Sequence, residues 1–169
     1  MTNLPAPLAA LDLALEASLQ AEVPAVDSRV AVAIGEHRYL IAVEALDEIS
    51  VVPAISRLGQ MPAAVVGLAN FRGAPRTLLD APAFLGLGQL DDPGAAWAMM
   101  LRSEEVGVAL LWPTLHGLFP ISAFTADGQL PTLPYAAQTY TDAQGQRWHE
   151  LDVPAVLTQL RRAPAKETA

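Results

Sequence analysis

Hydrophobic residues alternate with small or polar residues over two stretches of the chain, and a polar turn interrupts each stretch. In residues 29–43 the alternation runs on both sides of a turn at residues 35–38. In residues 97–111 it does so around a turn at residues 102–105. A period of two predicts β-strands with one face on a core, so each stretch predicts a β-hairpin. Because the two hairpins resemble one another, we expect two similar β subdomains.

Other patterns predict the remaining elements. We expect strands at residues 49–52 and within 65–79, and a third hairpin formed by residues 135–140 and 147–151. Asp80 is placed to cap a short helix that ends at Gly86, and Asp152 to cap a final helix with Arg161 and Arg162 at its carboxyl end. Leucines at three- or four-residue spacing predict an amphipathic helix over about residues 8–22: Leu8, Leu11, Leu15 and Leu19.

These elements predict a helical extension at residues 1–27, a main domain at 28–162 and a frayed tail at 163–169. Within the main domain we place the first β subdomain at about residues 28–90, plus closing elements, and the second at about 95–152.

The composition is apolar and poor in charge. Of 169 residues, 52% are hydrophobic and 17% charged, against about 25% charged in an average soluble domain. Two explanations stay open: the 31 alanines enrich the chain in small apolar residues, or part of an apolar surface is buried against partners.

The charge balance disfavours two classes of binding partner. The net charge is -8, which disfavours binding to nucleic acid or to an anionic membrane.

The sequence predicts neither a secretory signal nor a membrane span. The first residues lack the basic region of a secretory signal, so we expect this segment to remain part of the protein rather than to be cleaved off. Residues 106–126 carry no charge and are long enough to span a bilayer, but their glycines and prolines favour strands and turns. We therefore expect no direct membrane insertion.

Catalytic motifs are missing from the sequence. Cysteine is absent, and the three histidines (His37, His116 and His149) lie far apart without forming a metal-binding motif. No glycine-rich phosphate loop or activated serine motif occurs. We therefore expect neither an enzyme nor a bound cofactor or metal.

Polar residues within otherwise apolar strands are the remaining candidates: Glu48, Asn70, Arg72 and Asp80. Asp80 is explained by its helix cap, and Asn70 by a turn in which its side chain bonds the local backbone. Arg72 has two interpretations. Its guanidinium forms a structural ion pair with Glu48 or Asp80, or it recognises a partner.

Residues 62–73 (PAAVVGLANFRG), followed by residues 78–80 (LLD), resemble the signature of the CheW family of chemotaxis coupling proteins. Residues 39–49 (YLIAVEALDEI) are similar to the first hairpin of that family, and residues 106–108 and 151–152 match its second half more loosely. The resemblance covers about residues 28–160. The leucine-rich segment ahead of the first strand is more similar to the PilI branch, which serves type IV pilus and twitching systems.

The resemblance implies a mainly β fold with two small SH3-like five-stranded β-barrels side by side, an N-terminal helix and a C-terminal helix. It implies a non-catalytic, cytoplasmic adaptor, associated with membrane receptor arrays. Its implied partners are the signalling tip of a methyl-accepting chemoreceptor and the regulatory domain of a CheA-type histidine kinase. The positions that match the family's contact residues are Leu46, Glu48, Asn70, Arg72 and Gly73. Asp80 is expected to have a structural role and not to contact a partner.

Two departures from the family pattern carry expectations of their own. Pro75 cannot donate to a strand ladder, so we expect its strand to be bulged or at a sheet edge. Trp112 replaces a charged position and is either a core residue or an apolar contact. The alternative to an adaptor is a ligand-binding β-barrel for a small apolar molecule with no signalling role, which requires an internal cavity.

Overall fold

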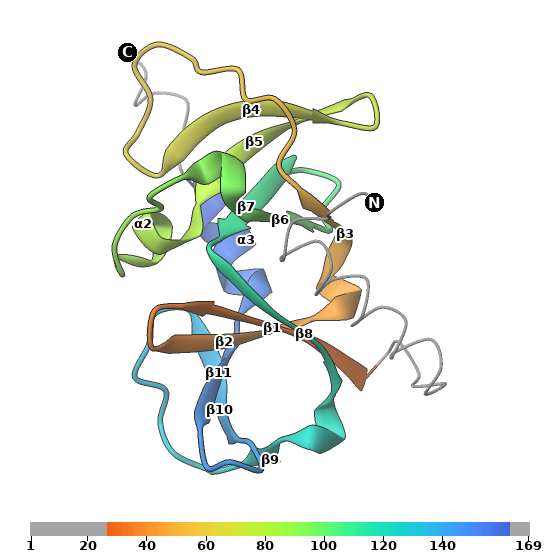
Figure 1. Cartoon of the computed structure of the whole chain (residues 1–169), viewed down its shortest axis with the longest axis vertical. Helices are drawn as coiled ribbons and strands as arrows, with labels where there is room; N and C mark the ends of the chain where they lie inside the picture. The colour runs from red at the N-terminus through yellow and green to blue at the C-terminus, as the bar shows by residue number, and fades with distance from the viewer. Residues whose placement is uncertain (1–26, 163–169) are drawn as a thin grey trace, which may run out of the picture. The chain divides into compact units, whose positions relative to one another are not determined.

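The computed structural model describes residues 27–162, and their contacts form two compact units (Figure 1). The first unit combines the chain up to Glu44 with Thr114–Leu151, and the second combines Ala45–Pro113 with the chain from Asp152 onward. This interleaved division differs from the consecutive subdomains expected at residues 28–90 and 95–152. The predicted helix at residues 8–22 and the tail at 163–169 lie outside the described residues.

The first unit is built on a six-stranded sheet with the order β8-β1-β2-β11-β10-β9. Its elements are β1 (Ser28–Ile34), β2 (His37–Ala42), β8 (Thr114–Pro120), η4 (Ile121–Ala123), β9 (Thr125–Ala126), β10 (Ala136–Thr141) and β11 (Arg147–Leu151). The β1–β2 and β10–β11 pairs are antiparallel and confirm both hairpins predicted in this part of the chain. Strand β11 also pairs with β2 in parallel, which joins the two hairpins into one mixed sheet.

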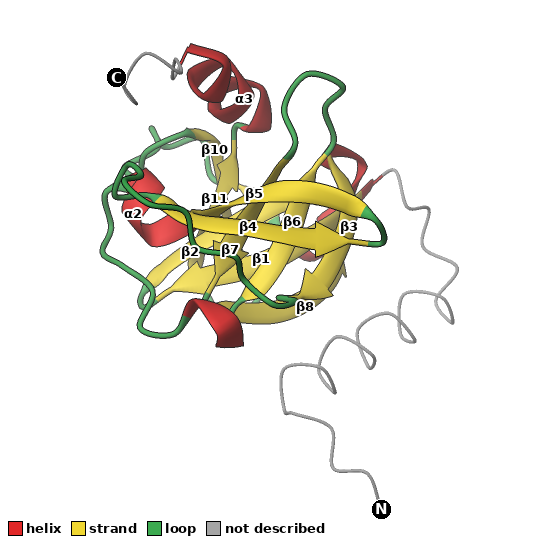
Figure 2. Ribbon diagram, turned by 90° about the horizontal axis from the view of Figure 1, so that it is seen from above, coloured by secondary structure: helices red, strands yellow, loops and turns green. Residues whose placement is uncertain are grey.

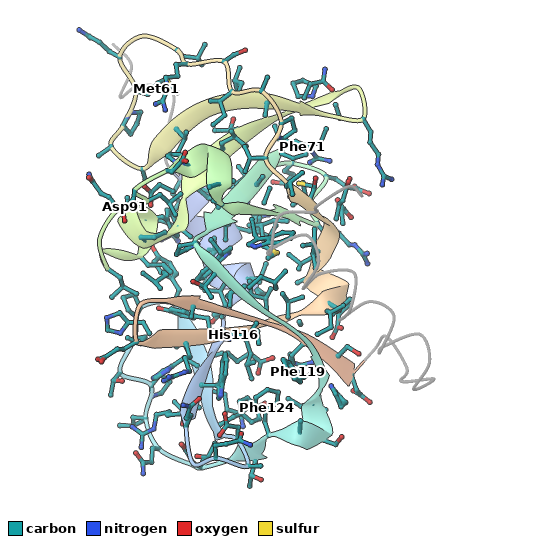
Figure 3. The ribbon with its side chains drawn as sticks, viewed as in Figure 1. Met61, Phe71, Asp91, His116, Phe119 and Phe124 are labelled. Carbon is teal, nitrogen blue, oxygen red and sulfur yellow. The ribbon has the colours of Figure 1, made fainter. Side chains whose placement is uncertain are left out.

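A β-bulge interrupts the pairing of β1 with β8. Ala31 lies opposite Gly117 and Val32 opposite Leu115, so His116 is the extra residue. A bulge re-aims the side chain at its site, and here that side chain is an imidazole. Figure 3 shows His116 with Phe119 and Phe124, which follow it along the chain.

The second unit is built on a five-stranded sheet with the order β3-β6-β7-β5-β4. Figure 2 labels these strands. Its elements are η2 (Val43–Ala45, at the boundary between the units), β3 (Leu46–Val51), β4 (Val65–Phe71), β5 (Ala74–Asp80), α2 (Ala81–Leu85), η3 (Pro93–Ala95), β6 (Trp97–Leu101), β7 (Val108–Trp112) and α3 (Val153–Arg162). Every residue of β6 and β7 is buried, as expected for central strands. Trp112 is 0% exposed and is therefore a core residue.

Neither sheet is a closed barrel, which corrects the expectation of SH3-like five-stranded barrels. Within residues 27–162, each strand order has two ends, β8 and β9 in one sheet and β3 and β4 in the other. In the second unit, one isolated bridge crosses between the chain after β3 and strand β4. Ser56 N–H donates to the Leu68 carbonyl at 2.8 Å, and Leu68 N–H donates to the Ser56 carbonyl at 2.9 Å.

The strand that contains Pro75 was expected to be bulged or at an edge and is neither. β5 lies between β4 and β7, and the bulge in the β4–β5 ladder inserts Val66 into β4. Pro75 pairs with Asn70 of β4, whereas β7 pairs with β5 only over Thr77–Asp80. The missing N–H of Pro75 therefore falls where β7 does not reach, and no ladder bond to β7 is lost.

Both predicted helix caps are present. The Asp152 carboxylate accepts a hydrogen bond from Ala155 N–H at 3.0 Å at the start of α3. Asp80 is 7% exposed and uses both carboxylate oxygens: one accepts from Ala83 N–H and the other from Leu90 N–H, each at 2.9 Å. Asp80 thus fixes the start of α2 and the loop that follows it.

We expect Asp80→Ala to lower the free energy of unfolding by about 2 kcal/mol, because two partly buried N–H groups would lose their acceptor. Asp80→Asn keeps one acceptor oxygen and should lower it by about half as much. Urea denaturation followed by tryptophan fluorescence measures both variants. Equal losses in the two variants would contradict the assignment of a bond to each oxygen.

Candidate functional site

The candidate contact residues centre on the tip of the β4–β5 hairpin. Phe71 and Ala74 form the last pair of the ladder, so Arg72 and Gly73 alone make the turn. Both have positive φ angles, 53° and 84°, as a type I′ turn requires. Glycine adopts this conformation readily, but for arginine it costs about 1 kcal/mol. Among the described residues only Tyr135 shares this strained conformation without being glycine.

The Arg72 side chain is 84% exposed, and its contact with the protein is weak. Its Nε lies 3.4 Å from Oε1 of Glu48, whose side chain is 27% exposed. An ion pair of this exposure contributes about 0–1 kcal/mol to stability. The sequence offered Glu48 and Asp80 as carboxylates that could pair with Arg72. In the structure Glu48 forms this ion pair, while the Asp80 carboxylate accepts hydrogen bonds from two backbone N–H groups.

The ion pair joins the two edge strands of the second sheet. Glu48 belongs to β3 at one end of the strand order, and Arg72 extends from β4 at the other. The side chains of Glu48 and Arg72 therefore meet between the two end strands of this sheet. The site is thus a tight turn that presents an exposed cation beside one carboxylate.

Leu46 lies apart from this group. It is 5% exposed and pairs with Leu101 of β6. A bulge between Leu46 and Glu48 breaks the alternation that would place residues two apart on one face of the sheet. Leu46 is therefore a buried residue. Asn70, expected in a turn, instead lies in strand β4 opposite Pro75 and is exposed.

A second ion pair on β3 was not predicted from the sequence. Arg102 donates from Nε to the Asp47 carboxylate at 3.0 Å and from a terminal nitrogen to the Leu46 carbonyl at 3.1 Å. These contacts anchor the bulged start of β3. Arg102 lies in a predicted polar turn, and no local signal in the sequence marks its pairing with a residue so distant along the chain.

Metal binding and membrane insertion gain no support from the described residues. No group of three His, Asp or Glu side chains within residues 27–162 is arranged to hold a metal ion. None of the helices described there combines the length and the hydropathy needed to cross a bilayer.

Large apolar residues that are exposed occur in both units, and none of them lies in the Arg72–Gly73 turn. They are Val51 and Leu58 in the second unit, and Phe119 and Leu130 in the first. The apolar composition therefore corresponds to no single exposed patch beside Arg72.

Comparison with known proteins identifies the family. The model of the CheW-like domain matches residues 29–161. No curated protein sequence matches the chain. The crystal structure of the scaffolding protein TtCheW from Thermoanaerobacter tengcongensis is similar in fold, with a TM-score of 0.62 over 73% of this chain and 87% of that one, at 14% sequence identity. Since the family model covers most of the sequence, this chain belongs to the family of proteins with a CheW-like domain.

Proposed function

We propose that the chain is a non-catalytic adaptor that couples methyl-accepting chemoreceptors to a CheA-type histidine kinase in a cytoplasmic signalling complex. Membership of the CheW-like family supports the adaptor role. The observation that carries the proposal is the hairpin tip, where a strained backbone presents an arginine that is 84% exposed. Strained residues persist where function requires them, and this arginine adds little to stability.

In this proposal Arg72, Gly73 and Asn70 contact the receptor's signalling tip, with Glu48 beside them. The turn fixes the direction of the Arg72 side chain, and the guanidinium offers a planar fork for carboxylates of the receptor. In the absence of receptor, Glu48 pairs with the Arg72 guanidinium. When the receptor binds, its carboxylates replace Glu48 or share the guanidinium with it. Leu46 acts indirectly in this arrangement, because its side chain is buried at the start of the strand that also carries Glu48.

The kinase partner is proposed to bind through its regulatory domain, and the system served is proposed to be that of type IV pili and twitching. Support for this branch comes from the leucine-rich sequence ahead of β1. A kinase and pilus genes beside the gene for this chain would support the branch, whereas flagellar genes would contradict it.

Co-purification tests the proposal as a whole. The full chain, the regulatory domain of the cognate kinase and a fragment of the cognate receptor that contains its signalling tip are mixed at tens of micromolar and separated by size. We expect a complex that contains all three components. Binding to neither partner would overturn the adaptor role, and binding to one alone would restrict it to that partner.

A further inference from the structure

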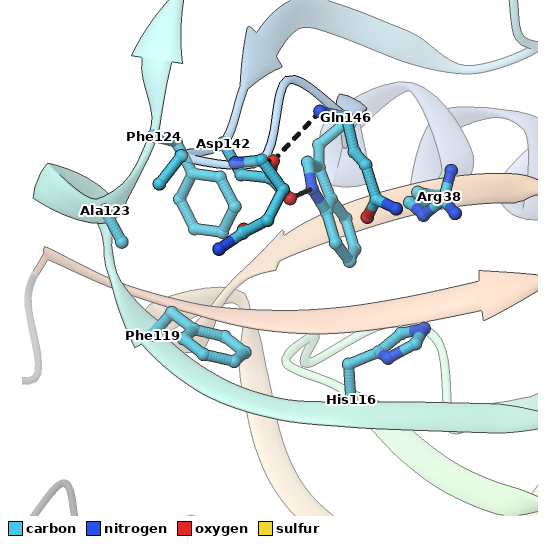
Figure 4. A pocket seen from close by; sticks show the side chains of 10 residues that line it. Arg38, His116, Phe119, Ala123, Phe124, Asp142 and Gln146 are labelled. Atoms are coloured by element: carbon cyan, nitrogen blue, oxygen red, sulfur yellow. Dashed lines mark hydrogen bonds between the residues drawn. The ribbon is translucent and has the colours of Figure 1, made fainter.

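A pocket of about 390 Å³ opens on the first unit, and none of its lining residues belongs to the candidate contact site (Figure 4). Its walls come from β2, β8, η4 and the residue after it, the turn between β10 and β11, and β11 itself. Its volume lies within the range of small-molecule sites in proteins, about 300–1,000 Å³. It opens at the surface, so it differs from the internal barrel cavity that the ligand-binding alternative requires.

One end of the pocket is aromatic. The ring of Phe124 lies edge-to-face with Phe119 at 6.2 Å and packs at a steep angle on Trp148 at 5.8 Å between ring centres. Trp148 is buried in the core of this unit, whereas Phe119 is 38% exposed. These contacts fix the three rings before any ligand arrives, and such a wall favours a planar aromatic group.

The opposite end of the pocket carries a cation. Figure 4 shows Arg38 and His116 at one side and Phe119 and Phe124 at the other. The one hydrogen bond from the Arg38 guanidinium is a long one, 3.5 Å to the carbonyl of Glu36. Among the described residues, no carboxylate lies within 4.0 Å of it. The guanidinium is therefore available to an anion.

Asp142 is the carboxylate that lines this pocket, and it interacts with the charge of Arg38 but directs its hydrogen bonds to other groups. Asp142 accepts hydrogen bonds from Trp148 Nε1 and from the backbone N–H groups of Gln144 and Gln146, each at 2.9 Å. Burial raises the pKa of Asp142, but these hydrogen bonds, together with the charge of Arg38, hold the pKa below its ordinary value. Burial, followed by the charge of Arg38, lowers the pKa of His116, so its imidazole is neutral at pH 7.

We propose that this pocket binds a small planar aromatic ligand that carries a carboxylate. The ring packs against Phe119, Phe124 and Trp148, and the carboxylate pairs with Arg38. The Asp142 carboxylate, with three N–H donors already bound, shapes the pocket rather than binding a cationic ligand. The pocket's small volume suits a free aromatic acid. This inference does not depend on the proposed adaptor role, because no residue of the pocket belongs to the hairpin site.

Indole-3-acetate is the probe for the test, and indole is its matched analogue without the carboxylate. The chain has three tryptophans, so ¹⁵N-labelled full chain gives three indole N–H signals in a proton–nitrogen correlation spectrum. Trp148 lies in the pocket, while Trp97 and Trp112 belong to the second unit. We expect indole-3-acetate to shift the Trp148 signal alone, with a dissociation constant of about 1 mM or tighter.

Arg38→Gln should weaken indole-3-acetate binding about tenfold or more and leave indole binding unchanged. Arg57→Gln removes the same charge from an exposed position of the second unit and should change neither. Phe119→Ala, at a half-exposed position, should weaken both ligands, and it keeps the test decisive if Arg38→Gln fails to fold. No shift of the Trp148 signal, equal shifts of all three signals, or indifference of indole-3-acetate to Arg38→Gln would each overturn the proposal.

Discussion

Gly67→Ala is expected to lower the free energy of unfolding of the second unit by about 2–4 kcal/mol. A Cβ at this position would lie 2.5 Å from the Ser56 carbonyl oxygen and 3.1 Å from Cγ2 of Ile55. The oxygen is backbone and cannot rotate away. It also accepts the hydrogen bond from Leu68 N–H that bridges the segment after β3 to β4. The φ angle of +154° adds strain for any residue with a side chain.

The measurement is urea denaturation monitored by fluorescence, with two of the three tryptophans in the affected unit. Gly59→Ala is the matched control, because a Cβ at Gly59 meets nothing within 4 Å and this residue lies in the segment that the Ser56–Leu68 bridge holds. We expect the control to unfold at nearly the same urea concentration as the parent chain. Similar midpoints for both variants would mean that the bridge does not require the close approach at Gly67.

Local structure could be predicted from the sequence because its signals are local. The hairpin β1–β2 followed from alternation around Gly35, and the caps at Asp80 and Asp152 followed from side chains that bond N–H groups three residues on. The division into units could not be predicted in this way. It depends on the parallel pairs β2–β11 and β5–β7, whose strands are distant along the chain. The hydrophobic pattern predicts which strands are buried, but it does not predict which strands lie next to each other in a sheet.

The candidate site shows the same limit. The motif around Arg72 marked these residues as contact candidates but did not predict that they form a hairpin turn. An Arg-Gly pair is not a typical type I′ sequence, as Asn-Gly is, so the positive φ of Arg72 could not be predicted. Leu46 and Glu48 are two residues apart, and strict alternation would expose them together. The bulge at this point of β3 separates them, because it inserts one unpaired residue into the strand.

Arg72→Asn is expected to stabilise the chain and to abolish receptor binding. Asparagine tolerates positive φ and is the preferred first residue of a type I′ turn, so the substitution relieves about 1 kcal/mol of strain. It also removes the exposed ion pair with Glu48, which is worth less than that. A small rise of the melting temperature should therefore accompany a loss of receptor affinity of about 30-fold or more, as for a central interface arginine.

Thermal unfolding and calorimetric titration with the receptor's signalling tip measure the two effects separately. Arg57→Asn, at an exposed position of the same unit, controls for the lost charge and should retain binding. Arg72→Glu should also abolish binding, but without the stabilisation, because it places a second carboxylate beside Glu48. A fall in the melting temperature of Arg72→Asn would show that the ion pair outweighs the strain. Retained binding would mean that the arginine is held in its strained conformation for a reason other than the receptor.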